Sequence, residues 1–291
     1  MFLQQLVNGI MLGSVYTLVA LAYTLVMGIL GVLNIAVAET FTFGGYVGLA
    51  LLLLKAPVAV ALVGAMAGGA ALGAIIERFG YRPLKHAPVV MPLLSTIGFS
   101  LLYQNVVTNV WGSDPIQFPS ALFSAKHQIG PVMISGMQAW IVASTLVMVL
   151  ALGQFLKYSR VGRGLRAVAE NPLAAAILGV DPGLVTTVTF LISGALAGAA
   201  GLLVGLNYSA ITPQIGGEVG LRGIAVMVVG GVTNVWGALL AGPILGISQV
   251  MAAAYLGASY QDLVVYGLLI VMLWIRPGGL LGSPDQLRRR V

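Results

Sequence analysis

The feature that most constrains this chain is a series of long apolar stretches that follow one another from end to end. A helix needs about 20 mostly apolar residues to cross a bilayer, and eight stretches approach that length: 5–30, 37–54, 58–77, 89–111, 132–156, 184–206, 237–256 and 262–276. Only 8% of the 291 residues are charged, whereas soluble domains carry about 25%. The sequence therefore predicts an all-α, polytopic membrane bundle of about eight transmembrane helices, with seven to ten as the range.

A further apolar segment, 221–236, is too short to cross a bilayer. It contains Gly230 and Gly231 and stops at Asn234. Broken helices are tolerated at membrane depth where protein or a water-filled cavity satisfies the freed backbone groups. The segment predicts a short or broken helix, with Gly230, Gly231 and Asn234 as candidates for the lining of a translocation pathway. The whole chain, 1–291, is predicted to be one transmembrane domain.

Basic residues are distributed unequally between alternate loops. Eleven lie in 78–88, in 157–183 and in the C-terminal tail, against three in the other loops. Because basic residues gather on the cytoplasmic side, the loop 157–182 and the C-terminus are expected to be cytoplasmic. These basic loops account for the net charge of +6. The expected partner of this charge is therefore membrane lipid, and no nucleic acid is expected. The side of the N-terminus depends on whether 31–54 crosses the membrane or re-enters it.

Several kinds of chemistry are not expected. The chain has no cysteine, and both histidines, His86 and His127, fall in predicted loops, so no metal, haem or other cofactor is predicted. None of the four lysines follows a Gly-x-x-x-x-Gly-Lys-Ser/Thr loop, which cradles nucleotide phosphates. We expect no catalytic residues, and ATP hydrolysis is expected on another polypeptide.

The insertion 157–182 contains the signals of a short helix. Asn171 is a good N-cap, Pro172 occupies a position that needs no backbone N–H, and Gly179 stands where a helix ends. Gly164 to Glu170 can add one or two turns, which places Arg166 and Glu170 four residues apart on one face.

The same insertion carries apolar side chains that would be exposed unless a partner covered them: Leu165, Val168, Leu173, Ile177 and Leu178. An exposed apolar patch indicates an interaction site. A short amphipathic helix that docks into a soluble motor is one interpretation. A solvated loop that only joins two spans is the other.

Glycines recur at helical spacing within two spans. Gly64, Gly68, Gly69 and Gly73 form one such face, and Gly194, Gly198 and Gly201 form another. Since lipid tails are as apolar as leucine, membrane helices associate by close backbone packing at small residues. These glycines predict tight helix packing.

Three segments resemble one family. Arg163-Gly-Leu-Arg-Ala-Val-Ala-Glu-Asn-Pro, continuing to Gly179-Val-Asp181, resembles the coupling-helix region of branched-chain amino acid ABC transporter permeases. The opening, Asn8-Gly-Ile-Met-Leu-Gly-Ser-Val-Tyr16 to Asn34, is similar to the start of the shorter permease of the pair. Val228-Val-Gly-Gly-Val and Trp236-Gly-Ala-Leu-Leu-Ala-Gly-Pro-Ile-Leu-Gly246 are similar too. The resemblance covers essentially the whole chain.

The resemblance implies a function and a set of partners. It implies the permease subunit of an ABC importer that moves branched-chain or related amino acids across the bacterial inner membrane by alternating access. The implied partners are a second homologous permease, two cytoplasmic ATPases and a periplasmic or lipid-anchored substrate-binding protein. Amides, urea and aromatic acids are other solutes of relatives. The residues implied in ATPase coupling are Arg163, Arg166, Glu170, Asn171, Pro172, Leu173, Ile177 and Gly179.

One stretch departs from the family pattern. After the first span the family usually reads Asn-Phe-Ala-His-Gly-Glu, whereas this chain reads Asn34-Ile-Ala-Val-Ala-Glu39. An ionisable group inside the membrane is a candidate functional site, so Asn34 and Glu39 are predicted to form a gate or to meet the ammonium group of the solute. The alternative is that Glu39 only stabilises the start of a helix through the helix dipole.

An ion-coupled secondary transporter or a channel is the alternative function. A proton-coupled carrier needs titratable groups within the bundle, and only Glu39 qualifies. No filter signature of a channel is present. An intramembrane enzyme would need paired aspartates, His-Glu-x-x-His, or a serine and histidine in the spans, and the sequence has none of these.

Overall fold

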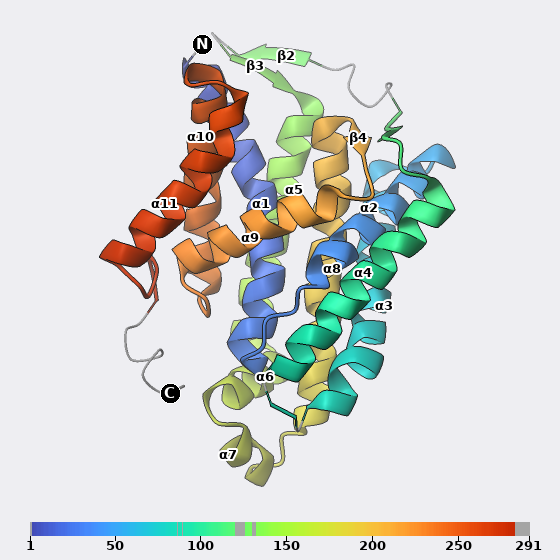
Figure 1. Ribbon diagram of the computed structural model, residues 1–291, viewed down its shortest axis with the longest axis vertical. Coiled ribbons are helices and arrows are strands. Elements are labelled where there is room, and N and C mark those ends of the chain that lie inside the picture. Colours follow the sequence, from blue (N-terminus) through green and yellow to red (C-terminus); the bar gives the residue numbers. More distant parts are fainter. Residues whose placement is uncertain (1, 86, 89, 120–125, 130–131, 283–291) are drawn as a thin grey trace.

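Long helices make up most of the protein (Figure 1). The computed structural model describes residues 2–85, 87–88, 90–119, 126–129 and 132–282. The helices are α1 (Phe2–Leu30), α2 (Val37–Leu53), α3 (Val58–Ile75), α4 (Val90–Trp111), α5 (Gly136–Tyr158), α6 (Arg160–Glu170), α7 (Pro172–Ile177), α8 (Pro182–Tyr208), α9 (Ile215–Gly230), α10 (Val235–Tyr255) and α11 (Gln261–Ile275). A π-helical turn (Ile76–Tyr81) and a 3-10 turn (Arg82–Leu84) extend α3, and a 3-10 turn (Ala258–Tyr260) precedes α11.

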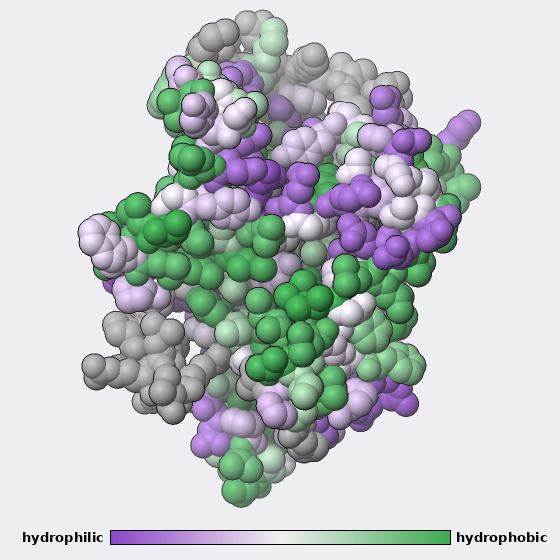
Figure 2. Space-filling model, in the orientation of Figure 1, coloured by the Kyte–Doolittle hydropathy of each residue, from purple (hydrophilic) through white to green (hydrophobic). Residues whose placement is uncertain are grey.

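Within the described ranges, seven helices are long and apolar enough to cross a membrane, and α2 is a shorter apolar helix. The predicted helical membrane bundle is therefore confirmed. In α1 and α8 the most apolar stretch is 89% and 78% buried, against 17% in α4 and 6% in α11. Figure 2 shows hydrophobic residues over α4 and α11 on the outside of the bundle. Such apolar outer surfaces fit a bilayer. Because α1 and α8 are the more buried helices, they form the centre of the bundle.

Two ends of the bundle can be distinguished in Figure 1, and we call them upper and lower. The N-terminus lies at the upper end with two small antiparallel pairs, β1 (Ile116–Gln117) with β4 (Ala210–Ile211) and β2 (Lys126–Ile129) with β3 (Val132–Ser135). The fifth span therefore begins at Gly136 and not at 132 as predicted. The lower end carries α6 and α7.

The segment 31–36 answers the question left by the sequence about 31–54. In Figure 1 it turns back into the bundle, and α2 starts there and runs to the upper end. The backbone N–H of Ile35 donates to Thr96 Oγ1 of α4 at 3.2 Å, which fixes the turn against a neighbouring helix. The stretch 31–54 therefore leads from the lower end of α1 back to the upper end, as an irregular turn followed by a short helix.

The predicted glycine faces pack against each other. A Cβ added to Gly69 would meet the backbone of Gly194 and Gly198, so α3 and α8 lie in backbone contact. A Cβ on Gly201 would meet Phe41 and Gly45 of α2. The interpretation of these glycines as packing residues is confirmed.

The helix signals in the 157–182 insertion are also confirmed. Asn171 Oδ1 accepts a hydrogen bond from the Ala174 N–H at 3.0 Å, so Asn171 caps α7. At the other end Gly179 has φ +86°, and the N–H groups of Gly179 and Val180 donate to the carbonyls of Ala176 and Ala175, both at 3.0 Å. This is a Schellman ending, in which glycine takes the left-handed position. The preceding helix, α6, is longer than predicted, because Ser159 caps it through Gly162 N–H at 2.7 Å.

Candidate functional site

Helix α9 lies across the bundle and crosses the central helix α1 (Figure 1). Two glycines permit the close approach. A Cβ added to Gly220 would lie 3.0 Å from the Tyr23 hydroxyl, and one added to Gly223 would collide with Val19. Val19 and Tyr23 are four residues apart and share a face of α1. The crossing therefore brings α9 directly onto the middle of the most buried helix.

The break after α9 is present, but the helix itself runs from Ile215 to Gly230 and not over 221–236. Gly231 has φ +111°. The carbonyl oxygens of Val229 and Gly230 accept hydrogen bonds from the N–H groups of Leu280 and Leu281, at 2.8 and 3.2 Å. The freed backbone groups are thus bonded to the segment that follows α11. Gly230 and Gly231 accordingly make close contacts with Gly237 and Gly282.

Asn234 joins this break to two parts of the chain. Its Oδ1 accepts from the N–H groups of Trp236 and Gly237, at 3.0 and 3.3 Å, and so caps α10. Its Nδ2 donates to the Leu281 carbonyl at 2.9 Å. Asn234 is therefore both a helix cap and the anchor of the C-terminal segment.

Replacing Asn234 with Ala is expected to lower the free energy of unfolding by about 1 kcal/mol, because a helix cap is lost. The measurement is thermal unfolding of the purified protein in detergent. Asn105→Ala on α4 is the control, since its Nδ2 makes only an exposed bond to the Leu101 carbonyl. Equal melting temperatures for both variants would contradict the capping role.

A cavity of about 580 Å³, which we call the lower cavity, lies below the crossing between α1, α5, α6 and residues 233–236. It brings together residues that the sequence analysis had assigned to two tasks, Arg166 and Glu170 to ATPase coupling and Asn234 to the translocation pathway. Thr24 of α1 also lines it, and its buried hydroxyl has no hydrogen-bond partner. The break after α9 and the predicted coupling region therefore share one cavity.

A second cavity of about 340 Å³, the upper cavity, lies between α1, α8, α10 and α11. Tyr208 and Gln249 line it, and neither was predicted as a pathway residue. The sequence analysis did not place them in the pathway, because one stands at the end of an apolar span and the other inside one. No motif marks either residue.

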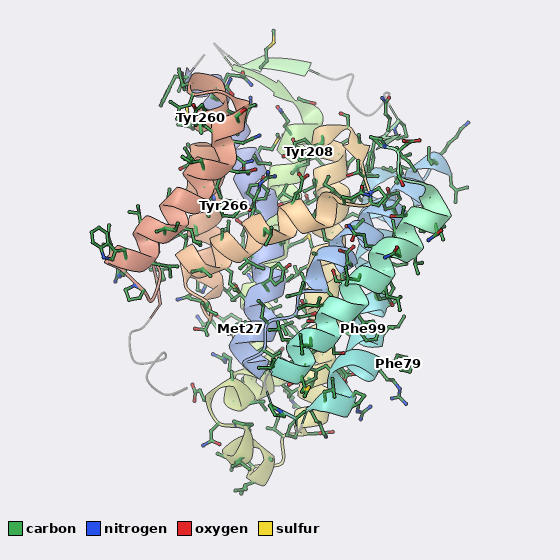
Figure 3. The ribbon with its side chains drawn as sticks, in the orientation of Figure 1. Met27, Phe79, Phe99, Tyr208, Tyr260 and Tyr266 are labelled. Atoms are coloured by element: carbon green, nitrogen blue, oxygen red, sulfur yellow. The ribbon has the colours of Figure 1, made fainter. Side chains whose placement is uncertain are left out.

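A polar cluster adjoins the upper cavity. Arg222 of α9, with a side chain 11% exposed, forms an ion pair with Asp262 of α11 at 2.9 Å. The Tyr16 hydroxyl lies close to Arg222 and Tyr208. Tyr266, which Figure 3 labels on α11, is close to the same ion pair. Among the residues that the structure describes, this is the one ion pair.

Glu39 is buried in the first turn of α2, with 4% of its surface exposed. Its Oε1 accepts a hydrogen bond from Ser100 Oγ of α4 at 3.1 Å, whereas its Oε2 has no partner. Tyr23 of α1 lies within electrostatic range of the carboxylate. Asn34 has a local role, because its Oδ1 accepts from the Ala36 N–H at 3.1 Å and shapes the turn into α2. Neither residue lines the two cavities.

The apolar residues of the 157–182 insertion divide into two groups. Leu165 and Val168 are 1% and 5% exposed and pack with Ala175 and Val185 of the same chain. The expectation that these two need a partner was wrong, because α6 folds back onto the start of α8. By contrast Leu173, Ile177 and Leu178 are 77%, 86% and 82% exposed. They form the apolar face of α7, and we call these three residues the α7 patch.

Two arginines of the insertion donate hydrogen bonds to backbone carbonyls. Arg163 donates to the Tyr158 carbonyl at 3.0 Å, and Arg166 donates to the Lys157 carbonyl at 3.2 Å. Arg166 and Glu170 form no ion pair, although their spacing favoured one. The two arginines instead bind the end of α5, which attaches α6 to the bundle.

These features define a class of protein: a multi-pass helical membrane protein whose helices line two cavities and whose lower end presents a short apolar helix. The family described as "Branched-chain amino acid transport system / permease component" matches residues 5–273. The chain belongs to this family.

Individual relatives agree with this assignment. The chain is 39% identical to the high-affinity branched-chain amino acid transport system permease protein LivH of Escherichia coli (strain K12), over 98% of this chain and 96% of that protein. It is 36% identical to the permease protein BraD of Pseudomonas aeruginosa, over 98% and 97%. PsaBC from Streptococcus pneumoniae, solved with a Fab, has a similar fold with a TM-score of 0.52 and 13% identity, over 94% of this chain and 91% of that one.

Proposed function

We propose that this chain is the permease subunit of an ABC importer that moves branched-chain or related amino acids across the bacterial inner membrane. Family membership supports the transport role, and the relatives' names support the solute. The α7 patch is the observation that supports docking of an ATPase: three large apolar side chains lie exposed outside the bundle, two on the six-residue helix α7 and one directly after it. Exposed apolar groups of this kind favour a docked partner.

The proposed assembly has four kinds of subunit. This chain, acting as a single transmembrane domain over 1–291, pairs with a second homologous permease. Two cytoplasmic ATPases hydrolyse ATP, and a periplasmic or lipid-anchored binding protein delivers the solute. This chain has no Gly-x-x-x-x-Gly-Lys-Ser/Thr loop to cradle nucleotide phosphates, and this supports the assignment of ATP hydrolysis to the ATPase subunits.

The lower end is proposed to face the cytoplasm, together with the C-terminus. Its basic residues support this orientation through the positive-inside rule. Arg78 and Arg82 follow α3, and Lys157, Arg160, Arg163 and Arg166 lie at and after the end of α5. Arg288, Arg289 and Arg290, which the same prediction used, lie outside the described residues.

Coupling is proposed to run from α7 through α6 to the central helix. Pro172 and Asn171 start α7 and Gly179 ends it, so the α7 patch is held on a defined helix. Ala175 on the opposite face of α7 packs with Leu165, Val168 and Val185, and Ile29 of α1 packs against the same cluster. A displacement of α7 by an ATPase would therefore reach α1. Arg163, Arg166 and Glu170 are proposed to keep α6 aligned with the lower cavity during this movement.

The pathway is proposed to involve Glu39. A buried carboxylate with one oxygen unpartnered is a suitable acceptor for an ammonium group. Asn34 is proposed to hold the turn that places Glu39. Gly230, Gly231 and Asn234 are proposed to let the end of α9 move over the lower cavity as access alternates.

Glu39→Gln is expected to reduce solute uptake at least about tenfold, because a hydrogen bond to a charged group contributes about 1.5–3 kcal/mol. The melting temperature is expected to stay the same or rise, since a neutral amide is less costly to bury than a carboxylate. Uptake and thermal unfolding are measured on the same preparations. Ser100→Ala, which removes only the partner of Oε1, is the control. Unchanged uptake by Glu39→Gln would contradict the pathway role.

Co-purification tests the proposed assembly directly. The chain, tagged and extracted gently from its own membrane, is expected to bring with it a second permease and an ATPase of the ABC type. Mass spectrometry of the complex identifies both. Recovery of the chain alone, in a form that still transports, would contradict the proposal.

A further inference from the structure

The lower cavity lies where the chain meets a membrane surface. Its lining comes from the lower end of α1, the last turns of α5, helix α6 and residues 233–236. Higher up, α5 presents exposed apolar side chains such as Val147 and Leu150 to the outside of the bundle. Lys157 is the first charged residue of α5 and lines the cavity. Because basic residues mark the ends of membrane spans, the cavity sits at the edge of the hydrocarbon region.

Three charged side chains line this cavity, two of them basic and one acidic: Lys157, Arg166 and Glu170. Arg166 and Glu170 are neighbours on one face of α6, with Cβ atoms about 5–6 Å apart. Arg166 also reaches α5, since it donates to the Lys157 carbonyl at 3.2 Å. Within the described ranges the ion pair is that of Arg222 with Asp262, beside the upper cavity. The three charges of the lower cavity therefore remain available to a ligand that carries both signs.

The rest of the lining is mostly apolar. Leu25 of α1, Leu156 of α5 and Val235 form part of it. Trp236 is half-exposed and lies against α5, because a Cβ added to Gly153 would be 3.2 Å from its ring. Tryptophan is enriched at the membrane–water interface, where its apolar ring and its polar N–H meet different surroundings. The cavity thus joins a charged rim on α6 to apolar walls that an acyl chain can follow.

We propose that the lower cavity binds a phospholipid whose headgroup joins a phosphate to a primary ammonium, as in phosphatidylethanolamine. Lys157 and Arg166 donate to the phosphate, and Glu170 accepts from the ammonium group two carbons away. The acyl chains start along the apolar walls and continue past Trp236 into the bilayer.

The charges select this headgroup over others. A purely anionic headgroup would be repelled by Glu170, and a quaternary ammonium has no N–H to donate to it. A free amino acid carries both signs, but it has no acyl chain to cover the apolar walls of a cavity of about 580 Å³. The inference depends on the membrane location of the chain and not on the solute that it carries.

The test uses the complete chain, purified in detergent with the subunits that accompany it and stripped of lipid. Native mass spectrometry measures binding over a series of lipid concentrations. The probes are phosphatidylethanolamine, phosphatidylglycerol and phosphatidylcholine, each with one palmitoyl and one oleoyl chain. Wild type is expected to bind phosphatidylethanolamine about fivefold more tightly than the other two, the effect of one charge at a headgroup.

Each variant has its own expected pattern. Lys157→Gln and Arg166→Gln should each weaken binding of all three lipids about fivefold. Glu170→Gln should remove the preference for phosphatidylethanolamine and leave phosphatidylglycerol bound no more weakly. Arg160→Gln is the matched control, because it removes an exposed basic residue of α6 that does not line the cavity. Ala169→Phe should fill the cavity and abolish specific binding without altering a charge, and the exposed Lys157 keeps the test decisive if this variant does not fold.

Two soluble competitors distinguish a lipid from a free ligand. Glycerophosphoethanolamine has the headgroup without the chains, and L-leucine has both charges on a small solute. Neither is expected to displace phosphatidylethanolamine, and displacement by either would show that the site takes a soluble ligand. Equal binding of the three lipids by wild type would overturn the proposal. So would a Glu170→Gln protein that keeps the preference, or a Lys157→Gln protein that binds as wild type does.

Discussion

Replacing Leu173 and Ile177 together with Asp is expected to abolish ATP-driven uptake. Both side chains project from α7 with 77% and 86% of their surface exposed, so the change leaves the packing of this chain intact. In the assembly the same positions would place carboxylates in an apolar groove, where an unpaired charge costs several kcal/mol. Since each 1.4 kcal/mol is a factor of ten in affinity, docking would be lost.

Three readings on one preparation check this expectation: uptake, solute-stimulated ATPase activity and the melting temperature. Uptake and stimulation should disappear, and the melting temperature should be that of wild type. Leu173→Met with Ile177→Met is the matched control, because it keeps both side chains apolar and close to the same volume. Transport that survives the double Asp change would refute coupling through the α7 patch.

Replacing Gly198 with Leu is expected to prevent the bundle from folding. A single Cβ at this position would collide with the Ala65 carbonyl of α3 and crowd Gly69, and Gly44 of α2 approaches the same site from the other side. Inserting even one or two methyl groups into a packed core costs about 1–3 kcal/mol. Gly198→Ala should therefore lower the free energy of unfolding by about that amount, and the leucine should exceed it.

Size-exclusion chromatography and thermal unfolding in detergent measure both changes. Gly98→Ala on α4 is the control, because nothing lies within 4 Å of the added Cβ, and its effect should stay within about 0.5 kcal/mol. A folded Gly198→Leu protein with a normal melting temperature would show that α2, α3 and α8 do not depend on backbone contact.

Local signals in the sequence were sufficient for the spans, the glycine faces and the caps. Apolar length alone located α1, α8 and their neighbours, because a membrane span is set by bilayer thickness. The spacing of Gly69 and Gly194 indicated close packing, although it did not reveal that the two glycines meet. Asn171 and Gly179 bounded α7 because caps and left-handed glycines act within a few residues.

Long-range placement could not be obtained in this way. Nothing in the order of residues indicates that α9 lies across α1 or that Arg222 reaches Asp262 forty positions away. Arg222 had been counted only as a loop charge. Leu165 and Val168 looked like docking residues because amphipathic spacing is the same whether the apolar face meets another chain or, as here, the start of α8.

Solute accumulation in proteoliposomes is the most direct test of ATP-powered import through this chain. The complete complex, with its binding protein on one side and ATP on the other, is expected to concentrate L-leucine only while ATP is hydrolysed, and to stop when the α7 patch carries Asp. This chain reconstituted by itself is expected to concentrate nothing. Accumulation by the isolated chain on an ion gradient, without ATP, would contradict the account.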